Sequence, residues 1–425
     1  MVDFKNTFPE IIYLALFIPI GLIPEYGALD RIATQWFYLS VLNICGLIYI
    51  FYDKKNKLNL KESLKYKPLI FLFGFVVWGL ISLTYSLNQT EVIVKFVRWV
   101  QLPISLFILT NIFKKNYSIY IKSIAIITSI TLLIELYFTY STFFQLTQFT
   151  AYDFQYAYLL RGATGNKNIN SASLMIKIPF LIYLIYTLRN HLLKFFLTGI
   201  LIFTSYLIFI LSSRSAIISF FLVFGILIFR YIFISVKKKS LNKDLSIFLV
   251  LGGMLFAIVL FNFNYAENNS ASFVKRASTI NEEDKSTQQR LRFYKHSIDH
   301  VISNPIVGVG LGNWKIKSVE YDKNDVDGYT IPYHTHNDFL EITSELGLVG
   351  LFLYMLIFIF PLLDILKSIN VKKFYGIDTI ILLAGIIYFV DANLNFPHAR
   401  PVMQAPFLII LVLSYLRNKI KPKYV

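Results

Sequence analysis

Apolar segments of about 20 residues recur along this chain, and they constrain its fold more than any other feature. A helix of about 20 apolar residues crosses the ~30 Å hydrocarbon core of a bilayer, so each segment predicts a membrane span. Of the 425 residues, 56% are hydrophobic and only 16% are charged, too few charges to cover a soluble globule of this size. We therefore expect an all-α, polytopic membrane protein rather than a chain with one soluble core.

The pattern predicts about twelve transmembrane helices. Their expected ranges are 8–24, 34–52, 68–87, 92–113, 119–144, 173–188, 195–211, 217–236, 245–263, 343–366, 375–391 and 401–416. One large extracytoplasmic loop with short helices, 264–338, separates the first nine spans (1–263) from the last three (339–425), all in one integral domain. No small-residue cleavage site follows the first apolar segment, so we expect a retained span rather than a removed signal peptide.

The net charge of +16 is concentrated in alternate loops. Lysine-rich runs occupy 54–67, 237–243, 367–373 and 417–423, whereas the intervening short loops hold only isolated arginines and a lysine. This is the distribution that the positive-inside rule predicts, so we expect both termini in the cytoplasm and the long loop outside. We prefer this explanation of the charge to nucleic-acid binding. The single cysteine, Cys45, excludes a disulfide within the chain.

Two features organise the long loop. The segment STQQRLRFYKHSIDHVISNP predicts an amphipathic helix, with Ser286 as its N-cap and its end before Pro305. The following VGVGLGNW contains a GxGxG pattern, a weak nucleotide-binding signal because no strand precedes it. We interpret these glycines as a tight turn that folds the loop back over the membrane mouth.

Among the arginines expected on the outer side, four face the same side as His334 and His336 and are candidates for the site: Arg161, Arg214, Arg290 and Arg292. An arginine at a membrane boundary is costly to desolvate unless it meets an anion or carbonyl groups, and its planar fork suits phosphate. Arg214 lies in the short SSRSA turn, so its side chain stays close to the helices. The alternatives are that Arg214 reaches lipid headgroups, and that Arg290 or Arg292 belongs to a solvated helix face.

Histidines and polar side chains gather in YHTHNDFLEITSELGLVG, just before an apolar helix. A neutral imidazole is the commonest general base, and nearby arginines would lower the pKa of His334 or His336 and keep it neutral. The alternative is a polar loop that only ends a span. Zinc bound by these and by His296 and His300 is conceivable, but the chain has no HExxH element and no cysteine ligands. We therefore expect no metal and no cofactor.

Ionisable residues inside the predicted spans favour a different class of protein. Lys95, Arg98, Glu135 and Lys177 fall within apolar segments. Such residues are functional candidates by default, and they would suit a proton-coupled secondary transporter. A transporter is therefore the alternative to an enzyme.

Four segments resemble the O-antigen ligase and O-antigen polymerase superfamily of bacterial membrane glycosyltransferases. In chain order they are RGATGNKNINSASL, LSSRSAIISF, QQRLRFYKHSIDHVISNPIVGVGLGNW and HTHNDFLEITSELGLVGLFLY. Each is loose by itself, but their order and the large late loop are typical of that family. The resemblance implies a site on the periplasmic side of the bacterial inner membrane, a glycan donor linked to undecaprenyl diphosphate, and inverting transfer without a metal.

The resemblance also implies residue roles. His336 corresponds to the family's catalytic histidine, and Arg214 and Arg290 to its diphosphate-binding arginines. Arg161, in the R-x-x-G-x-x-x-N region, is expected to line the site. We add His334, Asn337 and Arg292 as candidate substrate-binding residues.

The resemblance favours an O-antigen ligase with lipid A–core as acceptor. A polymerase that extends another lipid-linked glycan, or a protein O-glycosyltransferase, is the alternative within the family. The expected partners are the lipid-linked donor, the glycan acceptor and membrane lipids, with no nucleic acid.

Overall fold

The computed structural model describes residues 7–27, 30–52, 60–113, 117–148, 152–239, 244–265, 285–325, 333–366 and 376–419. These residues form helices and connecting turns without a β-strand, which confirms the predicted all-α class. The elements, in chain order, are α1 (Phe8–Phe17), η2 (Ile18–Leu22), α2 (Arg31–Tyr52), α3 (Leu60–Ser63), α4 (Lys67–Ile81), η3 (Ser82–Thr84), α5 (Gln89–Ile112), α6 (Tyr117–Thr147), η4 (Phe154–Tyr158), η5 (Gly162–Thr164), α7 (Lys167–Thr187), α8 (His191–Leu211), α9 (Arg214–Lys238), α10 (Leu245–Asn264), α12 (Lys285–Ser303), α13 (Trp314–Asp322), α14 (Asp338–Leu366), α15 (Ile377–Leu394), η7 (Pro397–Ala399) and α16 (Pro401–Lys419).

The predicted spans correspond to helices in the structure. Among the described residues, eleven helices are long and apolar enough to cross a bilayer, and the apolar segment Phe8–Leu22 is shorter. Pro19 interrupts that first segment with non-helical dihedral angles and divides it into α1 and η2. The twelve expected spans therefore correspond to eleven long helices and to the shorter segment Phe8–Leu22, which is interrupted at Pro19.

Side-chain caps explain where three spans begin earlier than the apolar pattern predicts. Asn88, Asn166 and Asn337 each accept a hydrogen bond from a backbone N–H two or three residues later. The helices α5, α7 and α14 therefore start at polar residues several positions before their apolar stretch. This matters for the site, because the polar first turns of α7 and α14 lie beside it.

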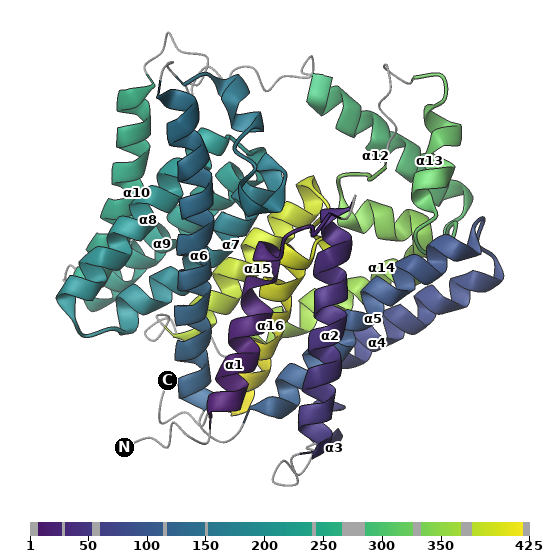
Figure 1. The fold of residues 1–425 in the computed structure, drawn as a ribbon, viewed down its shortest axis with the longest axis horizontal. Helices are drawn as coiled ribbons and strands as arrows, with labels where there is room; N and C mark the ends of the chain where they lie inside the picture. The colour runs from purple at the N-terminus through teal and green to yellow at the C-terminus, as the bar shows by residue number, and fades with distance from the viewer. Residues whose placement is uncertain are drawn as a thin grey trace.

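The spans differ in how far they are enclosed. In the apolar stretches of α7 and α16, 83% and 89% of the residues are buried, against 33% in α9 and in α14. Helices α7 and α16 are therefore central, and α9 and α14 present much of their surface outward. In Figure 1, α8, α9 and α10 flank one side of this centre, and α4 and α5 flank the other.

The loop helices α12 and α13 lie together at one end of the molecule (Figure 1). The start of α1 and the end of α16 lie at the other end. The prediction of a helix that ends before Pro305 is confirmed by α12, which ends at Ser303. The prediction that Ser286 caps it is wrong, because the helix already includes Lys285 and Ser286 is one residue inside.

The glycines form a tight turn, as predicted, and this turn packs against α14. Gly308, Gly310 and Gly312 all have positive φ, and the N–H of Gly310 donates to the carbonyl of Glu345 at 2.8 Å. Helix α14 is kinked at Gly347, where φ is 64° and ψ is −169°. A β-carbon at Gly347 would lie only 2.0 Å from the carbonyl oxygen of Ile306, so the turn fits into the kink only beside glycine.

Candidate active site

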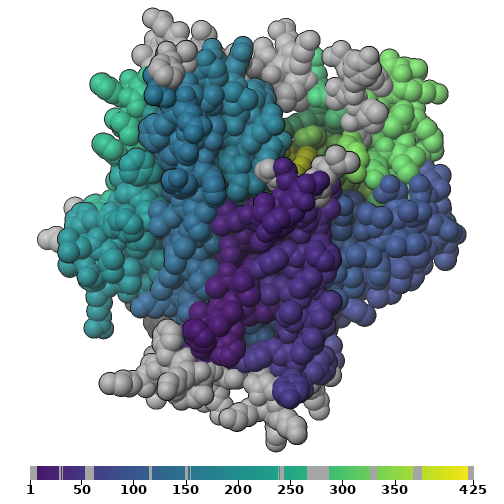
Figure 2. Space-filling view, viewed as in Figure 1, coloured from purple at the N-terminus to yellow at the C-terminus, as the bar shows by residue number. Residues whose placement is uncertain are grey.

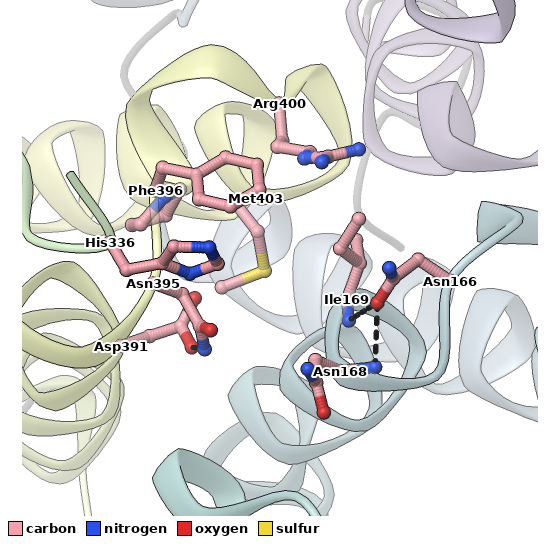
Figure 3. Close-up of a pocket in the computed structure, with 10 residues that line it drawn as sticks. Asn166, Asn168, Ile169, His336, Asp391, Asn395, Phe396, Arg400 and Met403 are labelled. Carbon is pink, nitrogen blue, oxygen red and sulfur yellow. Dashed lines mark hydrogen bonds between the residues drawn. The ribbon is translucent and has the colours of Figure 1, made fainter. Parts of the chain in front are cut away.

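A pocket lies where the first turns of α7 and α16 meet the segment before α14 (Figure 3). The pocket opens to solvent, and its cavity volume is about 40 Å³. The C-terminal part of the chain, yellow in Figure 2, is visible at the floor of a hollow beside the green loop helices. The lining residues are Asn166, Asn168, Ile169, His336, Asp391, Asn395, Phe396, Pro397, Arg400 and Met403.

Both the backbone and the ring of His336 make contacts that fix its position at the pocket. Its φ is +59°, a left-handed conformation that few non-glycine residues adopt. Its carbonyl oxygen accepts a hydrogen bond from the hydroxyl of Tyr294 at 3.0 Å, and its ring meets the Phe396 ring nearly edge-on at 5.0 Å. These contacts orient the imidazole toward the pocket at the cost of backbone strain.

The imidazole of His336 is neutral and available. Its Nδ1 is buried and has no hydrogen-bond partner among the residues that the structure describes. Burial, with a further contribution from the charge of Arg290, lowers the pKa of His336 to about 4. The ring is therefore uncharged at neutral pH, as a general base must be.

The structure brings Arg214 and Arg290 to the same region. Arg214 begins α9 directly after a tight turn, and its Nη1 donates a hydrogen bond to the Thr287 hydroxyl at 2.7 Å. Thr287 and Arg290 are one turn apart on α12, so they share a helix face. The charge of Arg290 acts on both His336 and Asp391. Arg290 therefore lies near the imidazole, and Arg214 is joined to the same helix, α12, through Thr287.

Asp391 links this region to the membrane helices. Its Oδ1 accepts hydrogen bonds from the Ser215 hydroxyl at 3.0 Å and from the Asn395 amide at 2.6 Å. Because Ser215 follows Arg214, these bonds hold the start of α9 against the pocket wall. We did not identify Asp391 or Asn395 from the sequence, where the only signal was a carboxylate at the outer end of an apolar helix.

Of the predicted site residues, His336 alone belongs to the pocket lining; Arg214, Arg290 and the others lie outside it. Arg161 is exposed, and its Nε donates to the carbonyl of Tyr158. Arg292 forms a 2.8 Å ion pair with the buried carboxylate of Asp322, which joins α12 to α13. Asn337 caps α14. These contacts connect and cap the elements around the site.

His334 belongs to a buried polar cluster next to the pocket. Its Nδ1 lies 3.0 Å from Oε1 of Glu341, and its ring stacks on Phe396 at 4.1 Å. His398 lies 3.3 Å from the same Glu341 oxygen through Nε2 and 2.6 Å from Asp338 through Nδ1. Burial lowers the pKa of His398, but the two carboxylates outweigh burial and raise it to about 9. Burial lowers the pKa of His334 to about 4.

This cluster contains the residues best placed to hold a metal. Ligand atoms of His334, Glu341 and His398 all lie within 4.8 Å of one another. However, Nζ of Lys95 lies 3.3 Å from Nε2 of His398 and 3.7 Å from the Glu341 carboxylate. A protonated lysine already neutralises that carboxylate and would repel a divalent cation. The zinc ligands considered from the sequence, His296 and His300, lie elsewhere: His296 is 3.1 Å from Asp322, and His300 is 3.2 Å from Tyr321.

The ionisable residues that favour a transporter are paired. Lys177 and Glu135 form a 2.8 Å ion pair between α7 and α6, with both side chains almost fully buried. The Ser173 hydroxyl lies within hydrogen-bond distance of both groups. Arg98 faces Asp30 at 3.4 Å near the outer end of α5. Closed pairs of this kind are compatible with a structural role, so they give the transporter interpretation little support.

Comparison with known proteins identifies similar sequences. Residues 198–355 match a family model described as O-antigen ligase. Over 387 residues, the chain is 26% identical to a Rickettsia typhi protein that carries the provisional name polysaccharide ligase, covering 85% of this chain and 87% of that protein. A Rickettsia prowazekii protein of the same name matches to the same extent. A Rickettsia conorii protein that also carries the provisional name polysaccharide ligase is 27% identical over 176 residues, covering 40% of this chain and 41% of that protein.

Proposed function

We propose that this chain, whose similarities support its assignment to the O-antigen ligase superfamily, transfers a glycan from a lipid diphosphate to an acceptor hydroxyl. The match to the family model and the relatives' names support a membrane enzyme of the O-antigen ligase type. The donor, the residue roles and the location of the reaction are our proposals. The observation that carries them is the neutral His336 imidazole, which lines the pocket close enough to Arg290 and Arg400 for both charges to act on it.

In the proposed reaction, His336 removes the proton from the acceptor hydroxyl as its oxygen attacks the anomeric carbon of the donor sugar. The bond between that carbon and the diphosphate breaks, and the electron pair leaves with the diphosphate oxygen. Attack from the face opposite the leaving group inverts the configuration. Arg214 and Arg290 would stabilise the negative charge that develops on the diphosphate, since guanidinium groups bind phosphate oxygens in pairs.

The position of the site in the molecule agrees with this scheme. The lysine-rich loops and the start of α1 are expected on the cytoplasmic side by the positive-inside rule. The pocket lies toward the end that carries α12 and α13, so we propose that the reaction occurs at the periplasmic face of the inner membrane. A polyprenyl tail would then extend between the outer halves of the spans while the diphosphate meets Arg214 and Arg290.

Reconstitution with a purified lipid-linked glycan tests the proposal. We expect transfer by the wild-type protein, and a loss of about 10²–10⁴-fold in rate for His336→Ala, the usual effect of removing a general base. Arg214→Gln should weaken donor use. Arg189→Gln is the matched control, because Arg189 is exposed in the loop after α7, at the opposite end of that helix from the pocket. Normal transfer by His336→Ala would remove the base from the scheme.

The same experiment distinguishes the acceptors. Ladders of product from the donor alone would identify a polymerase, and product that forms only with lipid A–core would identify a ligase. Transfer to a protein hydroxyl would identify a protein O-glycosyltransferase. Flux of substrate into sealed vesicles without transfer would contradict the proposed function and favour a transporter.

A further inference from the structure

Arg400 is a partly buried cation that has no ion-pair partner among the described residues. It precedes α16, lines the pocket, and places its guanidinium over the Phe396 ring at 4.6 Å. Its Nε is buried and has no hydrogen-bond partner, and no carboxylate lies within ion-pair distance of it among the described residues. Four arginines of the described residues have polar partners: Arg98 with Asp30, Arg214 with Thr287, Arg292 with Asp322 and Arg417 with Asp378.

The two carboxylates whose charges reach Arg400 are already engaged. Asp391 accepts hydrogen bonds from Ser215 and Asn395, and Asp30 faces Arg98. Burial lowers the pKa of Arg400 to about 10, so the guanidinium remains charged at neutral pH. A charge held partly away from water without a hydrogen-bonded partner is costly, and a bound anion would offset that cost.

The pocket around Arg400 has the chemistry of a sugar site. Figure 3 shows the guanidinium extending over the pocket from the Phe396 side toward Asn166. The oxygen of the Asn166 amide caps α7, and the Asn168 side chain also lies in the lining. An aromatic face, amide groups and one cation along this open pocket suit a sugar ring that carries an anionic group.

We propose that Arg400 binds an anionic oxygen group, a phosphate or a carboxylate, of the glycan substrate in this pocket. The proposal rests on the proposed function for the identity of the substrate, but the anion site itself does not depend on catalysis. The anion has two possible sources: the diphosphate of the donor, and an acidic group on the acceptor sugar. Both use the same bidentate contact to a guanidinium.

Three variants test the site: Arg400→Gln removes the charge, Arg400→Lys keeps it without the planar fork, and Arg189→Gln is the control for charge loss at an exposed position. The first measurement is binding of inorganic pyrophosphate and of glucuronate to the purified protein in detergent. We expect Arg400→Gln to weaken binding of one of these anions by about 10- to 100-fold, the usual effect of losing a charge-assisted hydrogen bond. Arg400→Lys should be intermediate, and Arg189→Gln should be unchanged.

The second measurement is the Michaelis constant in the transfer assay, with a glucose-terminated and a glucuronate-terminated acceptor. A higher KM for the lipid-linked donor with both acceptors assigns the anion to the donor diphosphate. A higher KM for the acidic acceptor alone assigns it to the acceptor. Either result supports the site.

Unchanged anion binding and unchanged KM values in a folded Arg400→Gln protein would overturn the inference and leave the proposed function intact. If the wild-type protein binds the anions but transfers no glycan, the proposed function is contradicted and the anion site stands. If Arg400→Gln does not fold, Arg400→Lys decides, because it retains the buried charge. Wild-type affinity for both anions in Arg400→Lys would then refute the fork contact.

Discussion

Lowering the pH from about 7.5 to 5.5 should leave kcat/KM for glycan transfer almost unchanged, because His336 is neutral throughout this range. Burial and the charge of Arg290 lower the pKa of His336 to about 4. At pH 5.5, about 97% of imidazoles with that pKa are neutral, whereas an ordinary pKa of about 6.5 leaves about 9% neutral. An unperturbed base would therefore lose about ten-fold in kcat/KM between these two pH values.

The sign follows from the direction of the shift. A pKa that is lowered in the folded enzyme means that protonation, and loss of the base, occurs only as the pH falls through about 4. The assay measures initial rates at subsaturating donor in buffers of constant ionic strength. The donor diphosphate is esterified at both ends, so it does not titrate in this range. Samples returned to pH 7.5 must recover full activity, which separates titration from unfolding.

A variant tests the cause of the shift. Arg290→Gln removes a positive charge that disfavours protonation of His336, so its residual activity should titrate at a higher pH than that of the wild type. A wild-type midpoint near 6.5, or a midpoint that does not rise in Arg290→Gln, would refute the assignment of His336 as a buried base beside this arginine.

Three further outcomes are expected. Gly347→Ala should destabilise the protein by about 2–5 kcal/mol in thermal unfolding, because its β-carbon meets a backbone carbonyl at a positive φ, whereas Gly199→Ala, which meets nothing within 4 Å, should not. Lys177→Met should lower the free energy of unfolding by about 3–5 kcal/mol, because it leaves Glu135 buried without its partner. The double variant Lys177→Met with Glu135→Leu should regain much of that stability. Equal destabilisation in the single and the double variant would contradict this. Treatment of the wild-type protein with EDTA should not slow transfer, since an ammonium group already faces the carboxylate of the histidine cluster; a loss that zinc restores would show a metal requirement.

The caps and the kink show where local sequence determines structure and where it does not. Apolar length predicted every span, because a segment must bury its own backbone bonds to cross a bilayer. Helix starts were missed by several residues at α7 and α14, where asparagine caps extend the helix into polar sequence. The glycine turn was predictable from composition, but its insertion at Gly347 was not, because the two segments are far enough apart in sequence that no local pattern relates them.

The sequence by itself determined the membrane class, the number of spans, and a short set of arginines and histidines able to handle a diphosphate and a proton. Only the tertiary structure decided that Arg290 lies near His336, that Arg214 contacts the same loop helix, that Arg292 is bound to Asp322, and that Arg400 lines the pocket. The physical reason is that hydrophobicity acts along one segment at a time. Whether a charge is paired inside the protein or left for a ligand depends on which helices pack against it.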